Sequence, residues 1–409
     1  MQFYIKQIQV NQILHLNGFT ISLGDSPKHL LITGQNGSGK TQLIKAIAEH
    51  LQLVCRDSSG HRLGIDKNAE HWTNYLKNAS DEPARNLARQ QLSSLELQKQ
   101  QFFGKVQIDF NDVFAMTNAY NANDFILAYY ETFRNPKFEE VHSIEKPDLT
   151  RPNDLSRNKV GQFLKFLADN KVQAALARNE GNLQDAENIN NWFNSFRDVL
   201  RNLFSDSKLE LDFDYTDYSF YINSFGKKFK FTQLSAGYAA ALDIVADLIL
   251  RMQKPGSLAR AYDKPGIVLI DEPETHLHLA LQRQIMPILT KLFPNVQFIV
   301  ATHSPFILSS LPNAVAYDLE HREELTDLTE YSYSALAEGY FGVEMASGDL
   351  TARISRLEKL VAKENLDSAE SEELKDLFKD LETVSEAAAP AIKGRILEQK
   401  RRYLAKGAK

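Results

Sequence analysis

Residues 34–41 form a glycine-rich loop that reads Gly-Gln-Asn-Gly-Ser-Gly-Lys-Thr, the pattern of a phosphate-binding loop. The pattern has chemical meaning only between a strand and a helix, and the flanking sequence supplies both. His29 to Thr33 is a short apolar run typical of a buried strand. Apolar residues recur at helical spacing after the loop, at Leu43, Ile47, Leu51 and Val54. The sequence therefore predicts an α/β fold built around a nucleotide phosphate.

The residue types in this phosphate loop each suit a step of phosphate binding. Glycines at 34, 37 and 39 permit positive φ, so that backbone N–H groups turn toward phosphate oxygens at the positive end of the helix. Lys40 would reach the β- and γ-phosphates of ATP, and the Thr41 hydroxyl would coordinate Mg2+. The residues expected to bind the nucleotide here are Gly34, Asn36, Gly37, Ser38, Gly39, Lys40 and Thr41.

A second candidate anion site follows much later in the chain. Gln233 to Gly237 reads Gln-Leu-Ser-Ala-Gly and opens an apolar helix, and we call this stretch the signature segment. Ser235, the Gly237 amide and the positive helix end can together hold a phosphate. The segment lies too far along the fold to serve the loop of its own subunit, so we expect two subunits to share each ATP. The alternative is an ordinary N-cap at Ser235 and a packing glycine at Gly237.

Two further apolar runs end in polar residues suited to phosphate chemistry. Gly266 to Ile270 reads as a central parallel strand and leads into Asp271 and Glu272. Asp271 would bind Mg2+ through water, and Glu272 would polarise the water that attacks the γ-phosphate. Val296 to Val300 is the next such strand, and His303 after it is placed to sense the γ-phosphate. We therefore predict Lys40, Glu272 and His303 as the catalytic residues.

Composition sets limits on the class of protein. With 409 residues, 43% of them hydrophobic, the chain can bury a large core. A net charge of -6 gives no overall basic field, so nucleic-acid binding is neither implied nor excluded. Cys55 is the single cysteine, which excludes an internal disulfide framework and favours the reducing cytosol. No apolar stretch approaches the roughly 18 residues of a membrane span. We therefore expect a cytoplasmic protein with no membrane partner.

Changes in composition along the chain predict a nucleotide fold that is split by insertions. Between Phe3 and Gly24, apolar and polar residues alternate in two stretches, which predicts an antiparallel N-terminal subsheet beside a mixed central sheet with flanking helices. The expected parts are an N-lobe with the phosphate loop (1–55), a helical insertion (56–104), a β segment of the core (105–150), a second helical insertion (151–207), a C-lobe (208–345) and a C-terminal helical segment with a basic tail (346–409).

The C-terminal segment leaves two interpretations open. Asp367 and Glu370 mark the start of its second helix. We expect Pro390 to end that helix and a basic tail to follow it. One interpretation is a packed hairpin with a solvated tail, and the other is a docking element for an effector protein or nucleic acid.

The ordered motifs resemble those of ABC-type P-loop AAA ATPases: Walker A, signature, Walker B and a histidine switch. Residues 271–279 read Asp-Glu-Pro-Glu-Thr-His-Leu-His-Leu, which is similar to the SMC-like and OLD-like branch rather than to transporter ATPases. The stretches that resemble ATPase subunits of Septu-type and retron-associated antiphage systems are 125–134, 245–251, 331–336 and 338–343. This resemblance covers roughly residues 1–345. It leaves the glutamine-loop and adenine-contact residues unassigned, with Gln107 and Arg134 as candidates.

The resemblance implies a homodimer or higher homo-oligomer that works beside a separately encoded effector, often an HNH nuclease. OLD-type relatives continue into a nuclease that needs an Asp-x-Asp pair, and the 106 residues after His303 contain none. We therefore expect an ATPase with no nuclease site of its own, acting in antiviral defence and controlling that effector. The alternative is an SMC-like DNA-repair or chromosome-maintenance ATPase that acts directly on DNA. The same motifs serve slow switches and fast motors.

Overall fold

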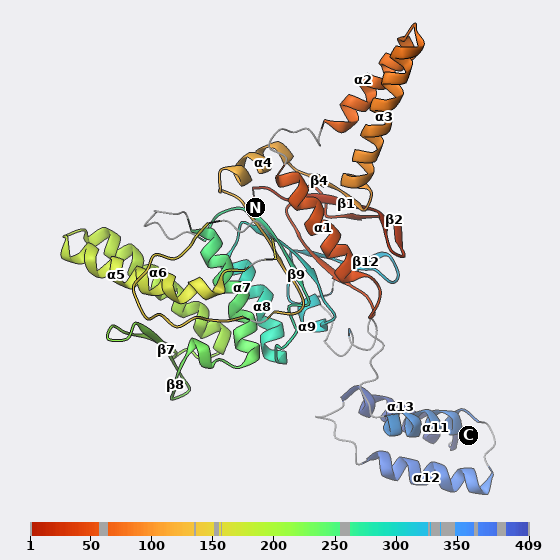
Figure 1. Cartoon of the computed structure of the whole chain (residues 1–409). Coiled ribbons are helices and arrows are strands. Elements are labelled where there is room, and N and C mark those ends of the chain that lie inside the picture. The colour runs from red at the N-terminus through yellow and green to blue at the C-terminus, as the bar shows by residue number, and fades with distance from the viewer. Residues whose placement is uncertain are drawn as a thin grey trace. The chain divides into compact units, whose positions relative to one another are not determined.

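A six-stranded sheet forms the centre of the computed structural model (Figure 1). Its strand order is β12-β11-β3-β10-β9-β5, and all neighbouring pairs are parallel except the edge pair β11–β12. The strands are β3 (His29–Thr33), β5 (Ile126–Tyr130), β9 (Gly266–Asp271), β10 (Val296–Ala301), β11 (Ala314–Asp318) and β12 (Glu323–Leu325). Every residue of β3, β5, β9 and β10 is buried, as their continuous apolar sequences require of strands covered on both faces.

The structure describes residues 2–56, 64–134, 136–150, 155–156, 158–253, 262–325, 328, 336, 348–363, 367–382 and 390–407. The chain divides into two compact units, residues 1–331 and 332–409. Apart from residue 336, the stretches 331–336 and 338–343 that carry part of the family resemblance lie outside the described residues. No described helix is long and apolar enough to cross a membrane.

The antiparallel N-terminal subsheet is present, with order β2-β1-β4. It consists of β1 (Ile5–Ile13), β2 (Leu16–Ser22) and β4 (Val106–Phe110). Gln297 of β10 connects it to the central sheet, because its buried amide accepts a hydrogen bond from the Ile5 N–H at 2.7 Å and donates to the carbonyls of Ile5 and Lys28. The subsheet and the helix α1 (Lys40–Cys55) share one hydrophobic core with β3 and β9.

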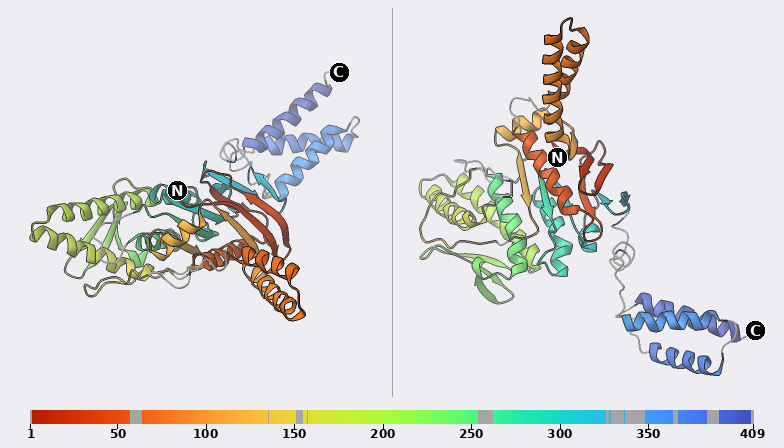
Figure 2. Two further views of the ribbon diagram at one scale, coloured as in Figure 1. Left: turned by 90° about the horizontal axis from the view of Figure 1, so that it is seen from above. Right: turned by 45° about the vertical axis from the view of Figure 1, so that its right-hand side comes forward.

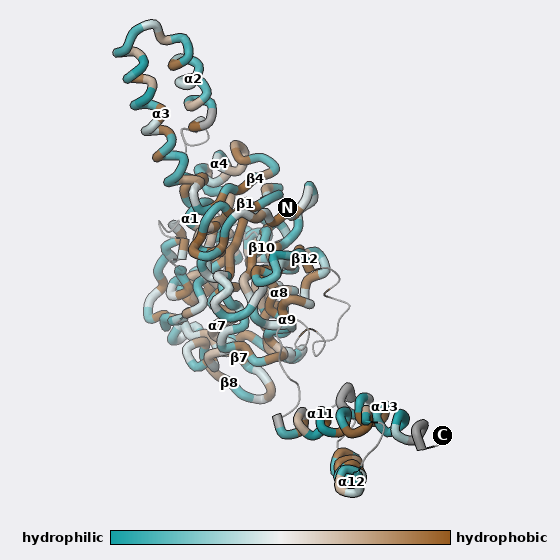
Figure 3. The backbone as a smooth tube through the Cα atoms, turned by 90° about the vertical axis from the view of Figure 1, so that its right-hand side faces the viewer, coloured by the Kyte–Doolittle hydropathy of each residue, from teal (hydrophilic) through white to brown (hydrophobic). Residues whose placement is uncertain are grey.

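Between α1 and β4 the chain forms a two-helix hairpin, α2 (Ile65–Asn78) and α3 (Glu82–Phe103), which extends away from the subsheet (Figure 1). Asp81 caps α3 by accepting a hydrogen bond from the Ala84 N–H, and Pro83 occupies its first turn. Hydrophilic residues predominate along both helices, whereas hydrophobic residues gather in the sheets (Figure 3). The short helix α4 (Val113–Asn121) then leads from β4 to β5.

Between β5 and β9 the chain forms a largely helical lobe, coloured yellow to green in Figure 2. It contains η1 (Val160–Gln162), α5 (Phe163–Asn179), α6 (Leu183–Phe204), the sheet β6 (Glu210–Asp214), β7 (Ser219–Ser224) and β8 (Lys227–Lys230), then η2 (Phe231–Gln233) and α7 (Ala236–Met252). Buried aromatic rings fill its centre, among them Phe163, Phe166, Trp192, Phe196 and Phe231. The helices α8 (Leu279–Leu292) and α9 (Pro305–Leu308) complete the first unit.

The second unit contains the helices α11 (Gly348–Ala362), α12 (Ser368–Glu382) and α13 (Pro390–Gly407). The predicted start of the middle helix is confirmed, since Asp367 accepts a hydrogen bond from the Glu370 N–H at 2.8 Å. The predicted tail after Pro390 is wrong, because that proline begins α13 rather than ending α12. Proline suits a first helical turn, and Ile396 is buried against the apolar residues of α11 and α12.

Histidine burial gives a stability prediction. His50 on α1 is buried, which lowers its pKa to about 4, against 6.5 when unfolded. Below the unfolded pKa, the unfolded chain takes up a proton that folded His50 does not, so stability falls as pH drops from 6.5 toward 4. The expected loss at about pH 5 is about 2 kcal/mol.

Urea unfolding followed by circular dichroism at neutral and acidic pH tests this. His50→Gln should reduce the acid sensitivity, whereas the same change at the exposed His71 should not. Equal pH dependence in the unsubstituted chain and the His50→Gln variant would contradict the assignment.

Candidate nucleotide-binding site

The phosphate loop connects β3 directly to α1, as the sequence predicts. Two of its glycines are required by geometry. Gly34 has φ 139°, and a Cβ there would lie 2.8 Å from Ser38 Oγ. Gly39 has φ 98° at the N-cap of α1, where a Cβ would lie 2.9 Å from the Leu16 side chain. The loop therefore holds a backbone path that a side chain would strain.

Lys40 is buried within this loop. Its Nζ donates hydrogen bonds to the carbonyls of Gly34 at 2.9 Å and Gln35 at 3.0 Å. Burial lowers the Lys40 pKa, while the carboxylates of Glu272 and Asp271 act to raise it. The ammonium group thus lies among loop carbonyls and acidic neighbours, where an anion could compete for its hydrogen bonds. Asn36, Gly37 and Thr41 are exposed at the same loop.

Asp271 ends β9 and is almost fully buried. Its Oδ2 accepts a hydrogen bond from Thr132 Oγ1 at 2.8 Å. Its Oδ1 is buried and has no hydrogen-bond partner among the described residues. A buried carboxylate oxygen without a partner is costly, and such an oxygen is the ligand type that Mg2+ prefers. With the Thr41 hydroxyl exposed at the start of α1, the residue types fit a magnesium site.

Glu272 and His303 follow β9 and β10, whose parallel register pairs Asp271 with Ala301. His303 Nε2 lies 3.5 Å from Glu272 Oε1, and both side chains are about a quarter exposed, at 27% and 28%. Burial, together with the charge of Lys40, lowers the His303 pKa to about 4. His303 is therefore neutral at neutral pH, and its ring can donate one hydrogen bond and accept another.

Glu274 is a third acid in this region to which the sequence analysis gave no role. Its Oε1 accepts hydrogen bonds from the His303 N–H at 2.6 Å and from Thr302 Oγ1 at 2.8 Å. Burial raises its pKa, and its Oε2 has no hydrogen-bond partner among the described residues. Glu274 thus ties the loop after β9 to the loop after β10. The available signal was its place in Asp-Glu-Pro-Glu, three residues after a buried strand end.

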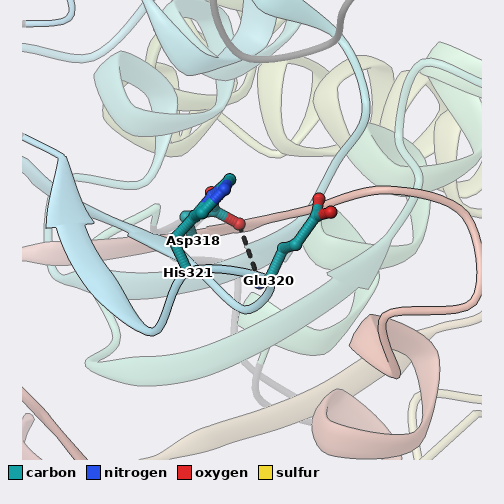
Figure 4. A group of neighbouring side chains, drawn as sticks. All are labelled: Asp318, Glu320 and His321. Carbon is teal, nitrogen blue, oxygen red and sulfur yellow. Dashed lines mark hydrogen bonds and ion pairs between the residues drawn. The ribbon is translucent and has the colours of Figure 1, made fainter.

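Asp318 ends β11 beside the phosphate loop, and no sequence motif pointed to it. It accepts hydrogen bonds from the Glu320 N–H at 2.9 Å and from His321 Nδ1 at 2.6 Å (Figure 4). A Cβ on Gly34 would lie 3.4 Å from Asp318 Oδ1, and the carboxylate raises the pKa of Lys40 and of His321. The side chain therefore adds negative charge close to the loop, while both of its oxygens already have protein partners.

The signature segment begins α7, with Ser235 at the N-cap. Ser235 is exposed, and its side chain makes no capping hydrogen bond. Gly237 is buried, and a Cβ there would lie 2.8 Å from the His276 carbonyl oxygen. Among the described residues, no hydrogen bond or ion pair connects Ser235 or Gly237 to the phosphate loop. The fold thus gathers Lys40, Asp271, Glu272 and His303 into one site that does not include the signature segment.

The two candidates for the glutamine-loop and adenine roles lie in different places. Gln107 is an exposed residue of β4, opposite Gln9 in the subsheet. Arg134 follows β5, the strand beside β9, and it donates hydrogen bonds to the carbonyls of Asp271 at 3.3 Å and Pro273 at 3.4 Å. Arg134, and not Gln107, therefore contacts residues 271–274, the acidic loop after β9.

The amino-acid sequence is similar to those of several known proteins. A family model described as "AAA domain, putative AbiEii toxin, Type IV TA system" matches residues 30–309. The Septu protein PtuA of Bacillus mycoides (strain KBAB4) is 26% identical over 390 residues, which are 92% of this chain and 50% of that protein. "Retron Vc95 probable ATPase" of Vibrio cholerae serotype O1 biovar El Tor is 30% identical over 162 residues, 37% of this chain and 31% of that protein.

The chain thus spans about half the length of the PtuA relative that it matches. Among solved structures, an SMC head bound to the C-terminal winged-helix domain of ScpA is similar at 12% identity and a TM-score of 0.36. That likeness covers 76% of this chain and 94% of the SMC head.

The Thr132–Asp271 hydrogen bond generates a prediction about metal affinity. Thr132→Val removes the donor but keeps the side-chain shape, so Asp271 loses the bond that fixes its orientation. We expect the Mg2+ concentration for half-maximal ATP binding to rise about tenfold or more. Fluorescent-nucleotide binding in an Mg2+ titration measures this. Thr132→Ser retains the hydroxyl and should behave like the unsubstituted chain, and an unchanged midpoint in Thr132→Val would refute the role.

Proposed function

Since this chain belongs to the AAA-domain family whose model matches residues 30–309, we propose that it is an ATP-binding and ATP-hydrolysing subunit of an antiphage defence complex. The observation that carries the proposal is the convergence of Lys40, Asp271, Glu272 and His303 at the carboxyl edge of the central sheet. Ligands of open α/β sheets bind at this edge. The similarity to a Septu protein and to a retron ATPase supports the defence setting.

In this proposal the phosphate loop holds the triphosphate. Backbone N–H groups of residues 34–41 and the positive end of α1 surround phosphate oxygens, and Lys40 exchanges loop carbonyls for the β- and γ-phosphates. Thr41 and Asp271 would hold Mg2+, which neutralises phosphate charge when bound. The buried Oδ1 of Asp271, without a partner among the described residues, supports this assignment.

Hydrolysis is assigned to the groups that follow β9 and β10. Glu272 is partly exposed and acts as the base that orients and polarises the attacking water. Neutral His303 lies 3.5 Å from that carboxylate, so its ring can donate a hydrogen bond to the γ-phosphate or to Glu272. Glu274 positions the His303 backbone and so sets the distance between the two groups.

The second anion site is assigned to a neighbouring subunit. Ser235 is exposed at the positive end of α7 and its hydroxyl makes no capping bond, which leaves it available to a phosphate. We propose that ATP lies between the phosphate loop of one subunit and the signature segment of another, in a homodimer or larger homo-oligomer. In line with the family resemblance, this assembly controls a separately encoded effector, which we propose to be a nuclease.

Two substitutions separate binding from hydrolysis. Lys40→Ala removes the phosphate contact and should abolish ATP binding, whereas Glu272→Gln keeps binding and should slow hydrolysis about 100-fold or more. Filter binding and phosphate release measure the two steps. ATP hydrolysis at the normal rate by Glu272→Gln would show that this residue is not the base.

The shared site is tested by Ser235→Arg, which puts a large cation where the proposal needs a small hydroxyl. ATP should still bind the phosphate loop, but ATP-dependent association and hydrolysis should fall to the level of Lys40→Ala. Light scattering with and without Mg2+ and ATP measures association. Ser235→Ala, which adds no bulk, is the milder control, and full activity of Ser235→Arg would exclude the two-subunit site.

A further inference from the structure

Helix α7 carries two fully buried carboxylates one turn apart, Asp243 and Asp247. They differ in how many of their oxygens accept a hydrogen bond. Asp247 accepts hydrogen bonds from Tyr130 OH at 2.7 Å, from Arg251 Nε at 2.6 Å and from the Lys159 N–H at 2.7 Å. Both of its oxygens are therefore engaged. Because Tyr130 belongs to β5, Asp247 fixes this part of α7 to the central sheet.

Asp243 lies one turn closer to the signature segment, and only one of its two carboxylate oxygens has a hydrogen-bond partner among the described residues. Its Oδ1 accepts a hydrogen bond from Asn158 Nδ2 at 2.5 Å, but its Oδ2 is buried without a partner among the described residues. Burial raises the Asp243 pKa to about 6, and the positive charge of Arg134 acts against that rise. A buried carboxylate oxygen without a hydrogen-bond partner is energetically unfavourable. A donor that reached Asp243 Oδ2 would therefore stabilise it.

Arg134 is the complementary group. Its guanidinium donates to the carbonyls of Asp271, Pro273 and Glu131, yet its Nε is buried without a hydrogen-bond partner among the described residues. Burial lowers its pKa, and Asp243 is the strongest of the charges that oppose this. Arg134 Nε, in the segment after β5, is thus an unsatisfied donor, and Asp243 Oδ2, on α7, is an unsatisfied acceptor. The charge of each group acts on the pKa of the other, so the two lie within electrostatic range.

We propose that Arg134 is a positioning residue that couples α7 to the loop after β9, by closing an ion pair with Asp243 when ATP is held between two subunits. The inference rests on the proposed function. Ser235 and Asp243 lie about 12 Å apart along one helix, and Asp247 anchors the next turn to β5. A phosphate held at Ser235 then moves the N-terminal part of α7, including Asp243, about that anchor. Arg134 then engages the free Asp243 oxygen while it still holds the Asp271 and Pro273 carbonyls. Asp271 and Glu272 are thereby aligned only after the partner subunit has engaged.

Two near-isosteric variants test the coupling. Asp243→Asn removes the charge and keeps the shape, and Arg134→Lys keeps the charge but cannot bridge several acceptors. Each should lower kcat about 2- to 30-fold, with little change in KM for ATP. The double variant should lose no more than the worse single variant, because both break the same pair.

A readout that does not need hydrolysis accompanies the rates. Because the ion pair closes only with nucleotide, Mg2+ and ATP should raise the Tm of both variants less than that of the unsubstituted chain. Without nucleotide, the Tm of Asp243→Asn should stay near that of the unsubstituted chain, whereas the Tm of Arg134→Lys should be lower, because lysine loses hydrogen bonds to the Glu131, Asp271 and Pro273 carbonyls. The comparison therefore uses the ATP-induced change in Tm of each variant. Asp247→Asn is the structural control. It disrupts the hydrogen bonds that Asp247 accepts from Tyr130 and Arg251, so it should lower Tm with and without ATP.

The possible outcomes distinguish failure of the Arg134–Asp243 coupling from failure of the proposed ATPase activity. Additive kcat losses, unchanged kcat, or equal ATP-induced Tm shifts in variants and parent would overturn the coupling. If one variant fails to fold, the other decides by the same kcat and Tm criteria. A parent chain that shows an ATP-induced Tm shift but never hydrolyses ATP would overturn the proposed ATPase, while the Tm shifts would still judge the coupling.

Discussion

The parallel pairing of β3, β10 and β9 is the constraint on which the rest of the site depends. Ala301 of β10 pairs with Ile32 of β3 on one side and with Asp271 of β9 on the other, so the three strands end at one edge. The loops that leave this edge carry Lys40, Glu272 and His303. Strand register therefore brings these side chains to one edge, and the hydrogen bonds of Glu274 connect the loops after β9 and β10.

The edge concentrates charge in a partly buried environment. Lys40 faces Asp271, Glu272, Glu274 and Asp318, and its own hydrogen bonds go to loop carbonyls. Asp271 and Glu274 each have one buried oxygen without a hydrogen-bond partner among the described residues. A triphosphate with its metal would bring both negative and positive charge to the groups that need them. The exposed Ser235 stands apart from this cluster, and we propose that it serves the ATP site of a second subunit.

Sequence alone predicted the parts that depend on local pattern. The phosphate loop, β3, α1, β9, β10 and the antiparallel subsheet follow from motif, apolar run or alternation, and the structure has them. The contacts of Thr132, Glu274, Asp318 and Arg134 were missed because they depend on which strands are neighbours. Thr132 is 139 residues from Asp271 in sequence and reaches it only because β5 pairs with β9. Helix α13 was missed because a proline that can end one helix can equally begin another.

The central claim is that one chain supplies half of each ATP site. The most direct measurement mixes Lys40→Ala chains with Ser235→Arg chains, each inactive alone, and follows phosphate release. In a mixed dimer, one site would combine the intact phosphate loop of the Ser235→Arg chain with the intact signature segment of the Lys40→Ala chain. Mixing should therefore restore hydrolysis. A mixture that stays inactive although mixed dimers form would contradict it.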